Sequence, residues 1–233
     1  MTAGAETTGV GPGRPRLEQR RRQGRTARAE ILDAAAELFT ANGYGNTSTR
    51  AVADAVGIRQ ASLYHHFAAK EDILDALLAE TVAVPAPLAE RLRTEAVPAV
   101  VRLYALAWYD VWQLCAARWN TAALYAIPEL RTERFRRFRL RRDELRRQYE
   151  TLAAATVDRS GATGVSAAIV LPFRLVETVV DIRSDEGDAP EWAVRAIPDA
   201  IIRMLGRPGE LAEVRAQARA FLSACGIEFS DGA

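Results

Sequence analysis

Residues 47 to 70 read TSTRAVADAVGIRQASLYHHFAAK, and this stretch decides the fold. The hydroxyl of Thr47 or Ser48 can accept an otherwise unpaired backbone N–H, which favours the start of a helix here. Gly57 is suited to end that helix, because glycine tolerates the left-handed conformation of a C-terminal cap. A second short helix is predicted over residues 59 to 66. The pattern is that of a helix-turn-helix, whose second helix is of the kind that a DNA major groove admits.

The same stretch resembles a known family. It is similar to the DNA-binding region of the TetR family of transcriptional regulators in four motifs: TSTR at residues 47–50, AVGI at 55–58, SLYHHF at 62–67 and KEDIL at 70–74. The resemblance extends over about residues 26 to 83. One departure is Arg59, which stands where family members often carry a small hydroxyl residue. We expect it to weaken the cap of the second helix and to add a cation to the DNA face.

The resemblance implies a homodimer that binds double-stranded DNA through an N-terminal three-helix domain. Gln60 and Ala61 are then expected to face base edges, because Gln suits adenine and the Ala methyl suits the methyl of thymine. Arg50 is expected to reach a base or a phosphate. Contacts that hold phosphates without reading sequence are expected from Thr49, Tyr64, His65 or His66, and Lys70. The family further implies a larger helical domain that binds a small effector, and repression that the effector relieves.

The N-terminus is basic although the net charge of the chain is only +1. Between residues 12 and 28 there are seven arginines against one glutamate. Such a segment neutralises phosphates and releases counterions. Residues 1–24 contain almost no apolar side chains, so we expect a disordered basic arm. Within it, GRPR at residues 13–16 resembles the core of an AT-hook, which would lay Arg14 and Arg16 along a minor groove. The alternative is a solvated tail.

The rest of the chain favours an all-α fold, because no alternating strand pattern of useful length appears. We expect a helix-turn-helix domain over residues 25–84 and a helical effector-binding and dimerisation domain over residues 85–233. The boundary is placed at Pro85, since proline stops helices. Further helices are predicted over these ranges: 26–42, 70–84, 98–120, 121–127, 131–159, 165–184, 192–205 and 210–225.

The larger predicted domain has two groups of candidate effector contacts. Four aromatic residues fit either an apolar cavity wall or plain core, and the sequence leaves both open: Trp108, Trp112, Trp119 and Tyr125. Arg174 and Glu177 interrupt an otherwise apolar helix at a spacing of three residues. They can pair with each other, meet a polar ligand group or contact a partner chain.

Two helices near the C-terminus are apolar around more of their circumference than one core contact requires. We expect them to form a two-fold four-helix bundle with the same pair of a second copy. The alternative places both helices in the centre of one chain. The expected interface residues are Val165, Ile169, Phe173, Val176, Val180, Ala196, Ile197, Ala200, Ile201 and Met204.

Several other classes of protein are disfavoured. The two cysteines form no CxxC motif, which indicates a reducing, cytoplasmic compartment and no zinc site. Residues 1–10 have no apolar centre typical of a signal peptide, and no run of ~18 apolar residues is present. His65 and His66 are the only histidines, so a Cys–His nucleophile is improbable and neither metal nor cofactor is expected. Two alternatives remain: a helical ligand-binding or scaffolding protein that binds no DNA, and a helical enzyme with an appended DNA-binding module.

Overall fold

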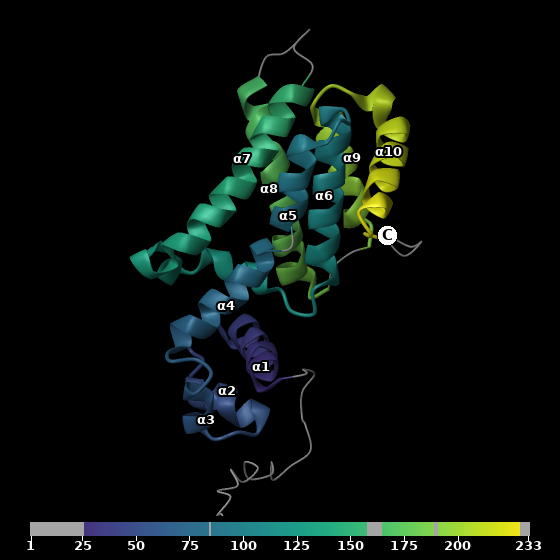
Figure 1. The fold of residues 1–233 in the computed structure, drawn as a ribbon. Coiled ribbons are helices and arrows are strands. Elements are labelled where there is room, and N and C mark those ends of the chain that lie inside the picture. The colour runs from purple at the N-terminus through teal and green to yellow at the C-terminus, as the bar shows by residue number, and fades with distance from the viewer. Residues whose placement is uncertain (1–25, 84, 158–164, 189–190, 229–233) are drawn as a thin grey trace, which may run out of the picture.

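The computed structural model describes residues 26–83, 85–157, 165–188 and 191–228. Every regular element within these ranges is a helix, so the predicted all-α fold is confirmed. The basic arm, with Arg14 and Arg16, lies outside the described residues. A smaller group of helices stands at one end of a larger bundle, and α4 leads from one to the other (Figure 1).

The smaller group consists of α1 (Ala27–Asn42), α2 (Thr49–Val56), α3 (Gln60–Tyr64) and α4 (Lys70–Ala83). The sequence left open whether Thr47 or Ser48 caps α2. The cap is Ser48, whose Oγ accepts a hydrogen bond from the Ala51 N–H at 3.1 Å. Thr47 is buried instead, and its hydroxyl bonds the carbonyls of Leu38 and Gly43. These two hydrogen bonds of Thr47 hold the end of α1 against the start of α2. The hydroxyls of Thr47 and Ser48 are therefore both used.

The turn between α2 and α3 has the conformation that the sequence predicted. Gly57 has φ 75° and ψ 35°, and its N–H returns to the carbonyls of Ala53 and Asp54. This left-handed conformation is the reason that glycine suits the position. The predicted end of the second helix at residue 66 is too late, because α3 ends at Tyr64. Beyond it, the N–H groups of residues 66 and 67 both bond the Leu63 carbonyl in a tight turn.

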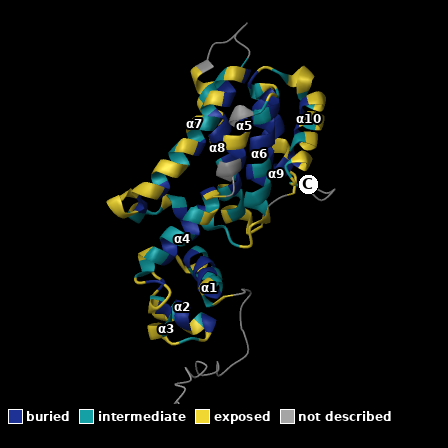
Figure 2. Ribbon diagram, in the orientation of Figure 1, coloured by how far each residue is buried: buried dark blue, intermediate teal, exposed yellow. Residues whose placement is uncertain are grey.

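The larger bundle is built around α6 (Ala99–Ala116), which is mostly buried (Figure 2). Contacts to it come from α5 (Pro85–Thr94), α7 (Arg136–Thr156), α8 (Val165–Glu186), α9 (Ala193–Met204) and α10 (Leu211–Ala224). The short 3₁₀ helix η4 (Pro208–Glu210) precedes α10. Pro85 was expected to mark a break, and it is the first residue of α5. Proline suits the first turn of a helix, because the N–H groups there have no partner within the helix.

The segment between α6 and α7, residues 117–135, joins the two groups of helices, and we call it the connecting segment. It contains η1 (Thr121–Ala126), η2 (Pro128–Arg131) and η3 (Glu133–Phe135). A long helix was predicted from residue 131, which is wrong at its start because α7 begins at Arg136. The physical reason is packing: Leu130 and Phe135 are buried in the core of the smaller group.

The cores of the two groups are separate clusters of buried side chains. The core of the smaller group takes in Leu124, Leu130, Phe135 and Phe138, which come from beyond α4. The division of the chain after residue 84 therefore stays a prediction. In the described part of the chain, no helix has the length and apolarity needed to cross a bilayer.

Candidate functional site

The outer surface of α2 and α3 carries three side chains joined by hydrogen bonds. Nε2 of Gln60 donates to Oγ1 of Thr49 over 2.9 Å, and the Tyr64 hydroxyl lies 3.1 Å from the same oxygen. Gln60 and Tyr64 are exposed one turn apart on α3, while Thr49 begins α2. The group fixes the outer face of α3 relative to the start of α2. The sequence placed all three residues on this face but gave no sign of the bonds between them.

A cleft of about 530 Å³ lies beside this group. Thr49, Tyr64 and Lys70 line it together with the first residues of α2 and α4. Unpaired N–H groups and the helix dipole make the start of a helix favourable for an anion. Two helix starts, the hydroxyl residues Thr49 and Tyr64 and the Lys70 ammonium therefore line a space that can receive a phosphate, and Glu71 lines it as well.

Lys70 is held in place from within the protein. Its Nζ donates to the Tyr44 carbonyl and lies 4.0 Å from the centroid of the Tyr44 ring. Burial lowers the pKa of the Lys70 ammonium. One of its three N–H donors is thus used, and two are left for another acceptor.

The other residues predicted on this face are accessible. The side chains of Arg50 and Asp54 are both strongly exposed and lie 3.9 Å apart, a distance at which such a pair adds little stability. Arg59 precedes α3 and caps none of its N–H groups, as expected. The remaining predicted contacts are all exposed: Arg59, Ala61, His65 and His66.

The four aromatic candidates do not share one cavity wall. Trp108 is buried in the core of the larger bundle. Trp112, Trp119 and Tyr125 line three different cavities. Trp108 and Trp112 lie on α6, whereas Trp119 and Tyr125 belong to the connecting segment.

Arg174 and Glu177 pair with each other, with 3.0 Å between Nη1 and Oε2. Glu177 also forms an ion pair with Arg142, whose guanidinium lies 5.1 Å from the centroid of the Tyr125 ring. A cavity of about 410 Å³ opens beside Tyr125, Arg142 and Glu177 and continues along Asp181 of α8. Two of the predicted effector residues, Tyr125 and Glu177, thus meet at one cavity.

A buried carboxyl near Glu177 was not predicted from the sequence. Asp110 of α6 accepts hydrogen bonds from Gln113 at 2.8 Å and from the Tyr149 hydroxyl at 3.0 Å. Burial raises the pKa of Asp110 to about 6, and the nearby charge of Glu177 acts in the same direction. The only signal was an aspartate inside the apolar run of residues 103–111. Its partner on α7, Tyr149, could not be predicted from the spacing of residues in the sequence.

The residues predicted for a dimer interface fall into two sets. Phe173, Val176, Ile197 and Ile201 are buried in the core of the chain itself, so they cannot offer a surface to a second copy. Ile169, Val180 and Met204 are partly exposed, Ala196 and Ala200 are exposed, and the side chain of Val165 lies outside the description. Three large apolar side chains that were not in the predicted set are exposed near them: Val170, Leu171 and Trp192.

The sequence and fold were compared with known proteins. The family model for bacterial regulatory proteins of the tetR family matches residues 31–77. The crystal structure of AmtR from Mycobacterium smegmatis is 55% identical, with a TM-score of 0.83 over 91% of this chain and 100% of that one. The chain belongs to the TetR family. The family resemblance seen in the sequence is therefore confirmed, and so is the arrangement of an N-terminal helix-turn-helix with a larger helical part.

Other relatives of this TetR-family chain match over shorter lengths or in fold alone. The transcriptional repressor KstR2 of Mycobacterium tuberculosis is 49% identical over 51 residues, which are 22% of this chain and 26% of the length of KstR2. The structure of AibR in complex with isovaleryl coenzyme A and operator DNA is 20% identical, with a TM-score of 0.62 over 78% of this chain and 98% of that one. The family model and the name of KstR2 describe regulators of transcription, and the likeness to AibR shows the shared fold.

Proposed function

We propose that this TetR-family chain is a transcriptional repressor that binds a palindromic operator as a homodimer and is released by a small effector. It acts in the cytoplasm, where the operator is found. The observation that carries the proposal is the bonded group of Thr49, Gln60 and Tyr64 on the exposed face of α2 and α3. The alternative of a scaffolding protein without DNA binding does not require polar side chains on this face.

The roles of the DNA face follow from its geometry. Gln60 presents an amide at the outer side of α3, and an amide can bond adenine in two places. Thr49, Tyr64 and Lys70 surround the cleft that suits a phosphate, so they fix the register of the protein on DNA. Arg50, Arg59 and the two histidines add exposed groups to the same face, and Arg14 and Arg16 are proposed to enter the neighbouring minor groove.

The dimer is proposed to form through the exposed faces of α8 and α9, which contact each other within one chain. Ala196 and Ala200 lie one turn apart on α9 and allow a close approach of two helices. Val170, Leu171 and Trp192 supply apolar area around them. Because the residues are the same on both copies, a two-fold axis between them gives a self-complementary interface.

The effector is proposed to bind in the larger bundle beside Tyr125 and Glu177. A ligand there would touch η1 and α8 at once. AibR, whose fold this chain shares, was crystallised with both isovaleryl coenzyme A and operator DNA. Its example supports a link between ligand and DNA in this fold.

The proposal is tested by selecting bound fragments from the sheared genomic DNA of the source organism. We expect recovery of a site with two-fold symmetry and half-sites about one helical turn, ~34 Å, apart or more. A gel-shift titration of that site should show one complex containing two chains. Recovery of fragments without a shared motif would favour the alternative of a helical protein with no specific DNA binding.

A further inference from the structure

Two adjoining cavities lie where the smaller group of helices meets the larger bundle. The first, of about 380 Å³, is bounded by α1, α4 and the start of the connecting segment. The second, of about 340 Å³, continues along α4 to the end of α6. Leu77, Glu80, Ala117 and Thr121 line both. We call these two neighbouring cavities the junction groove, and neither shares a lining residue with the cavity beside Tyr125.

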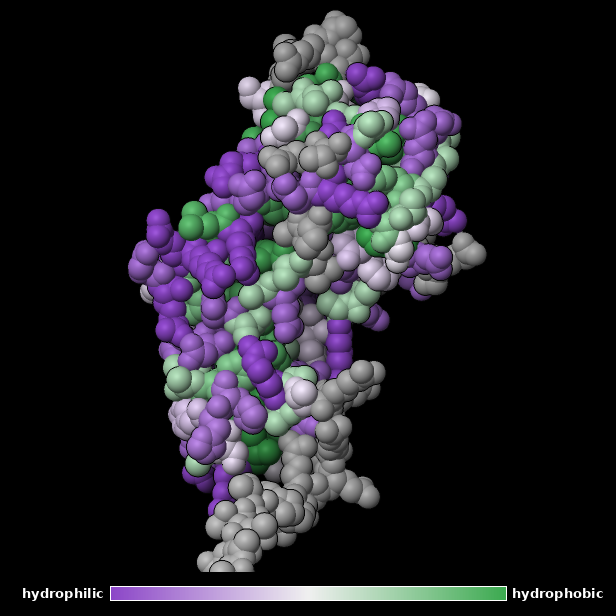
Figure 3. Space-filling view, in the orientation of Figure 1, coloured by the Kyte–Doolittle hydropathy of each residue, from purple (hydrophilic) through white to green (hydrophobic). Residues whose placement is uncertain are grey.

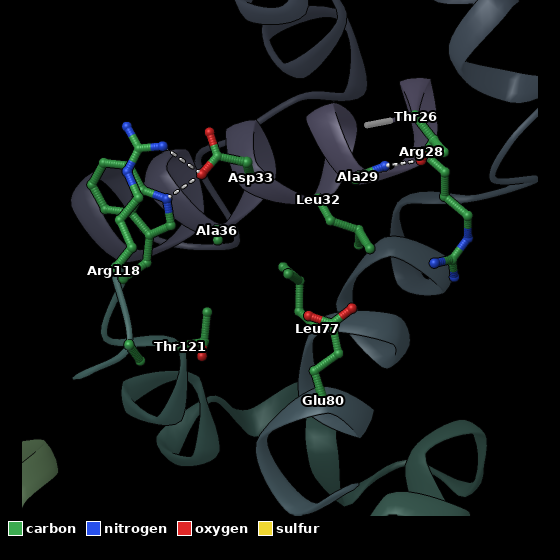
Figure 4. A pocket seen from close by; sticks show the side chains of 12 residues that line it. Thr26, Arg28, Ala29, Leu32, Asp33, Ala36, Leu77, Glu80, Arg118 and Thr121 are labelled. Carbon is green, nitrogen blue, oxygen red and sulfur yellow. Dashed lines mark hydrogen bonds and ion pairs between the residues drawn. The ribbon is translucent and has the colours of Figure 1, made fainter. Parts of the chain in front are cut away.

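The charges at one end of the junction groove are already paired. Oδ1 of Asp33 accepts hydrogen bonds from Arg118 and from Nε1 of Trp119, both at 2.9 Å (Figure 4). The Asp33 side chain is only 14% exposed. These contacts join α1 to the connecting segment and leave this carboxylate occupied.

Among the described residues, the charged side chains at the other end of the groove form no ion pair. In the described part of the chain, Glu80 of α4 makes no hydrogen bond and has no cation within 4.0 Å, although burial raises the pKa of its carboxyl and Arg28 lowers it from further away. Arg28 of α1 also has no carboxylate within that distance among the described residues, and its guanidinium lies 4.8 Å from the centroid of the Phe67 ring. Figure 4 shows Glu80 reaching from α4 toward Leu32 of α1, with Leu77 beside it and Arg28 on the same side of the groove.

We propose that the junction groove binds a small zwitterion of the α-amino-acid class, with its ammonium at Glu80 and its carboxylate at Arg28. A simple amine would be repelled by Arg28, and a simple acid would be repelled by Glu80. A zwitterion satisfies both charges, and each contact is a charge-assisted hydrogen bond. Leu32 and Leu77 line the same space and offer contact to an apolar side chain.

The position of the groove allows a bound ligand to affect the DNA face, and this step rests on the proposed function. Its walls come from α1 and α4 of the DNA-binding part and from residues 117–121 of the connecting segment. A molecule between them that binds one arrangement of these walls better than another shifts the population of arrangements. Operator affinity and ligand affinity must then change each other by the same factor.

The site is tested first without DNA. The full chain is screened by thermal shift against the twenty L-amino acids at millimolar concentration, and the best stabiliser is titrated by calorimetry. We expect one amino acid, or a chemically related group of them, to raise the melting temperature. The amine that lacks its carboxylate and the acid that lacks its ammonium should each bind about tenfold more weakly or worse. Equal binding of either fragment, or no stabilisation by any amino acid, would overturn the proposal.

Two variants place the ligand in the groove. Glu80→Gln and Arg28→Gln change exposed side chains, so both should fold as the wild type does, and each should weaken binding about tenfold or more. Glu191→Gln, which changes an exposed glutamate outside the groove, is the matched control and should bind normally. Unchanged affinity in both groove variants would move the site elsewhere. These binding measurements contain no DNA, so they test the ligand site alone. A failure of operator binding would appear only in the gel-shift titration, which is run with and without the amino acid.

Discussion

Nε1 of Trp119 donates a 2.9 Å hydrogen bond to Oδ1 of Asp33, and this bond ties the helix α1 to a residue 86 positions later in the chain. Arg118 donates to the same oxygen from a half-exposed position. Nearby, the Tyr125 hydroxyl donates to Thr81 of α4. The DNA-binding part is thus held to the larger bundle by polar contacts as well as by the apolar side chains of the connecting segment.

Removing the donor of this bond tests its contribution to stability. Trp119→Phe keeps an aromatic ring but loses the N–H, so the free energy of unfolding should fall by about 1 kcal/mol or more. Arg118→Gln should cost less, since the arginine side chain is 52% exposed and its ion pair is screened by water. Urea titrations of the two variants compare the effects. A larger loss in the arginine variant would mean that the ion pair is the main tie.

The dimer surface is tested by a charge on α9. Ala200→Arg places a long cation at the proposed contact, and because Ala200 is exposed the fold of one chain should survive. We expect a folded monomer by sedimentation and loss of tight operator binding, since one chain reads one half-site. Ala220→Arg, on the exposed side of α10, is the control and should stay dimeric. A dimeric Ala200→Arg variant with normal DNA binding would remove this face from the interface.

Local features of this fold were predictable, and contacts between distant segments were not. The cap at Ser48 and the left-handed turn at Gly57 depend on neighbouring residues only, so the sequence indicated both. The start of α7 was misplaced because the tertiary packing of Leu130 and Phe135 overrides a helical pattern. The bonds of Thr49 with Gln60 and of Asp110 with Tyr149 join separate helices. One sequence carries no signal of which distant side chains meet, and the spread of the aromatic residues over three cavities follows from the same limit.

The buried carboxyl of Asp110 predicts a dependence of stability on pH. Its pKa rises from 3.8 to about 6 on folding, so the folded chain holds a proton that the unfolded chain has lost between these values. The free energy of unfolding should therefore fall as pH rises through this window, by up to ~3 kcal/mol from this group, and level off above it. Asp110→Asn should lack this part of the dependence. The measurement is the difference between wild type and variant in urea titrations at several pH values, because the other acidic residues are common to both. A constant difference would contradict a protonated Asp110.

Tyr64 is predicted to serve phosphate binding and not base reading. Its hydroxyl lies 3.1 Å from Oγ1 of Thr49 and lines the cleft at the starts of α2 and α4. Tyr64→Phe should weaken binding to the operator and to all of its single-base variants by a similar factor, about tenfold or less. Competition gel shifts over the set of variants measure this. A loss confined to one base position would assign Tyr64 to base recognition.

The central claim is that the α2–α3 face reads an operator through Gln60. The most direct measurement is a fluorescence anisotropy titration of wild type and Gln60→Ala against the selected operator and every single-base variant of one half-site. We predict that Gln60→Ala loses ~1–3 kcal/mol of discrimination at one base pair and keeps the preferences at all others. Gln217→Ala, which changes an exposed glutamine on α10, should match the wild type throughout. A Gln60→Ala variant that retains the full wild-type preference at every position would contradict the account.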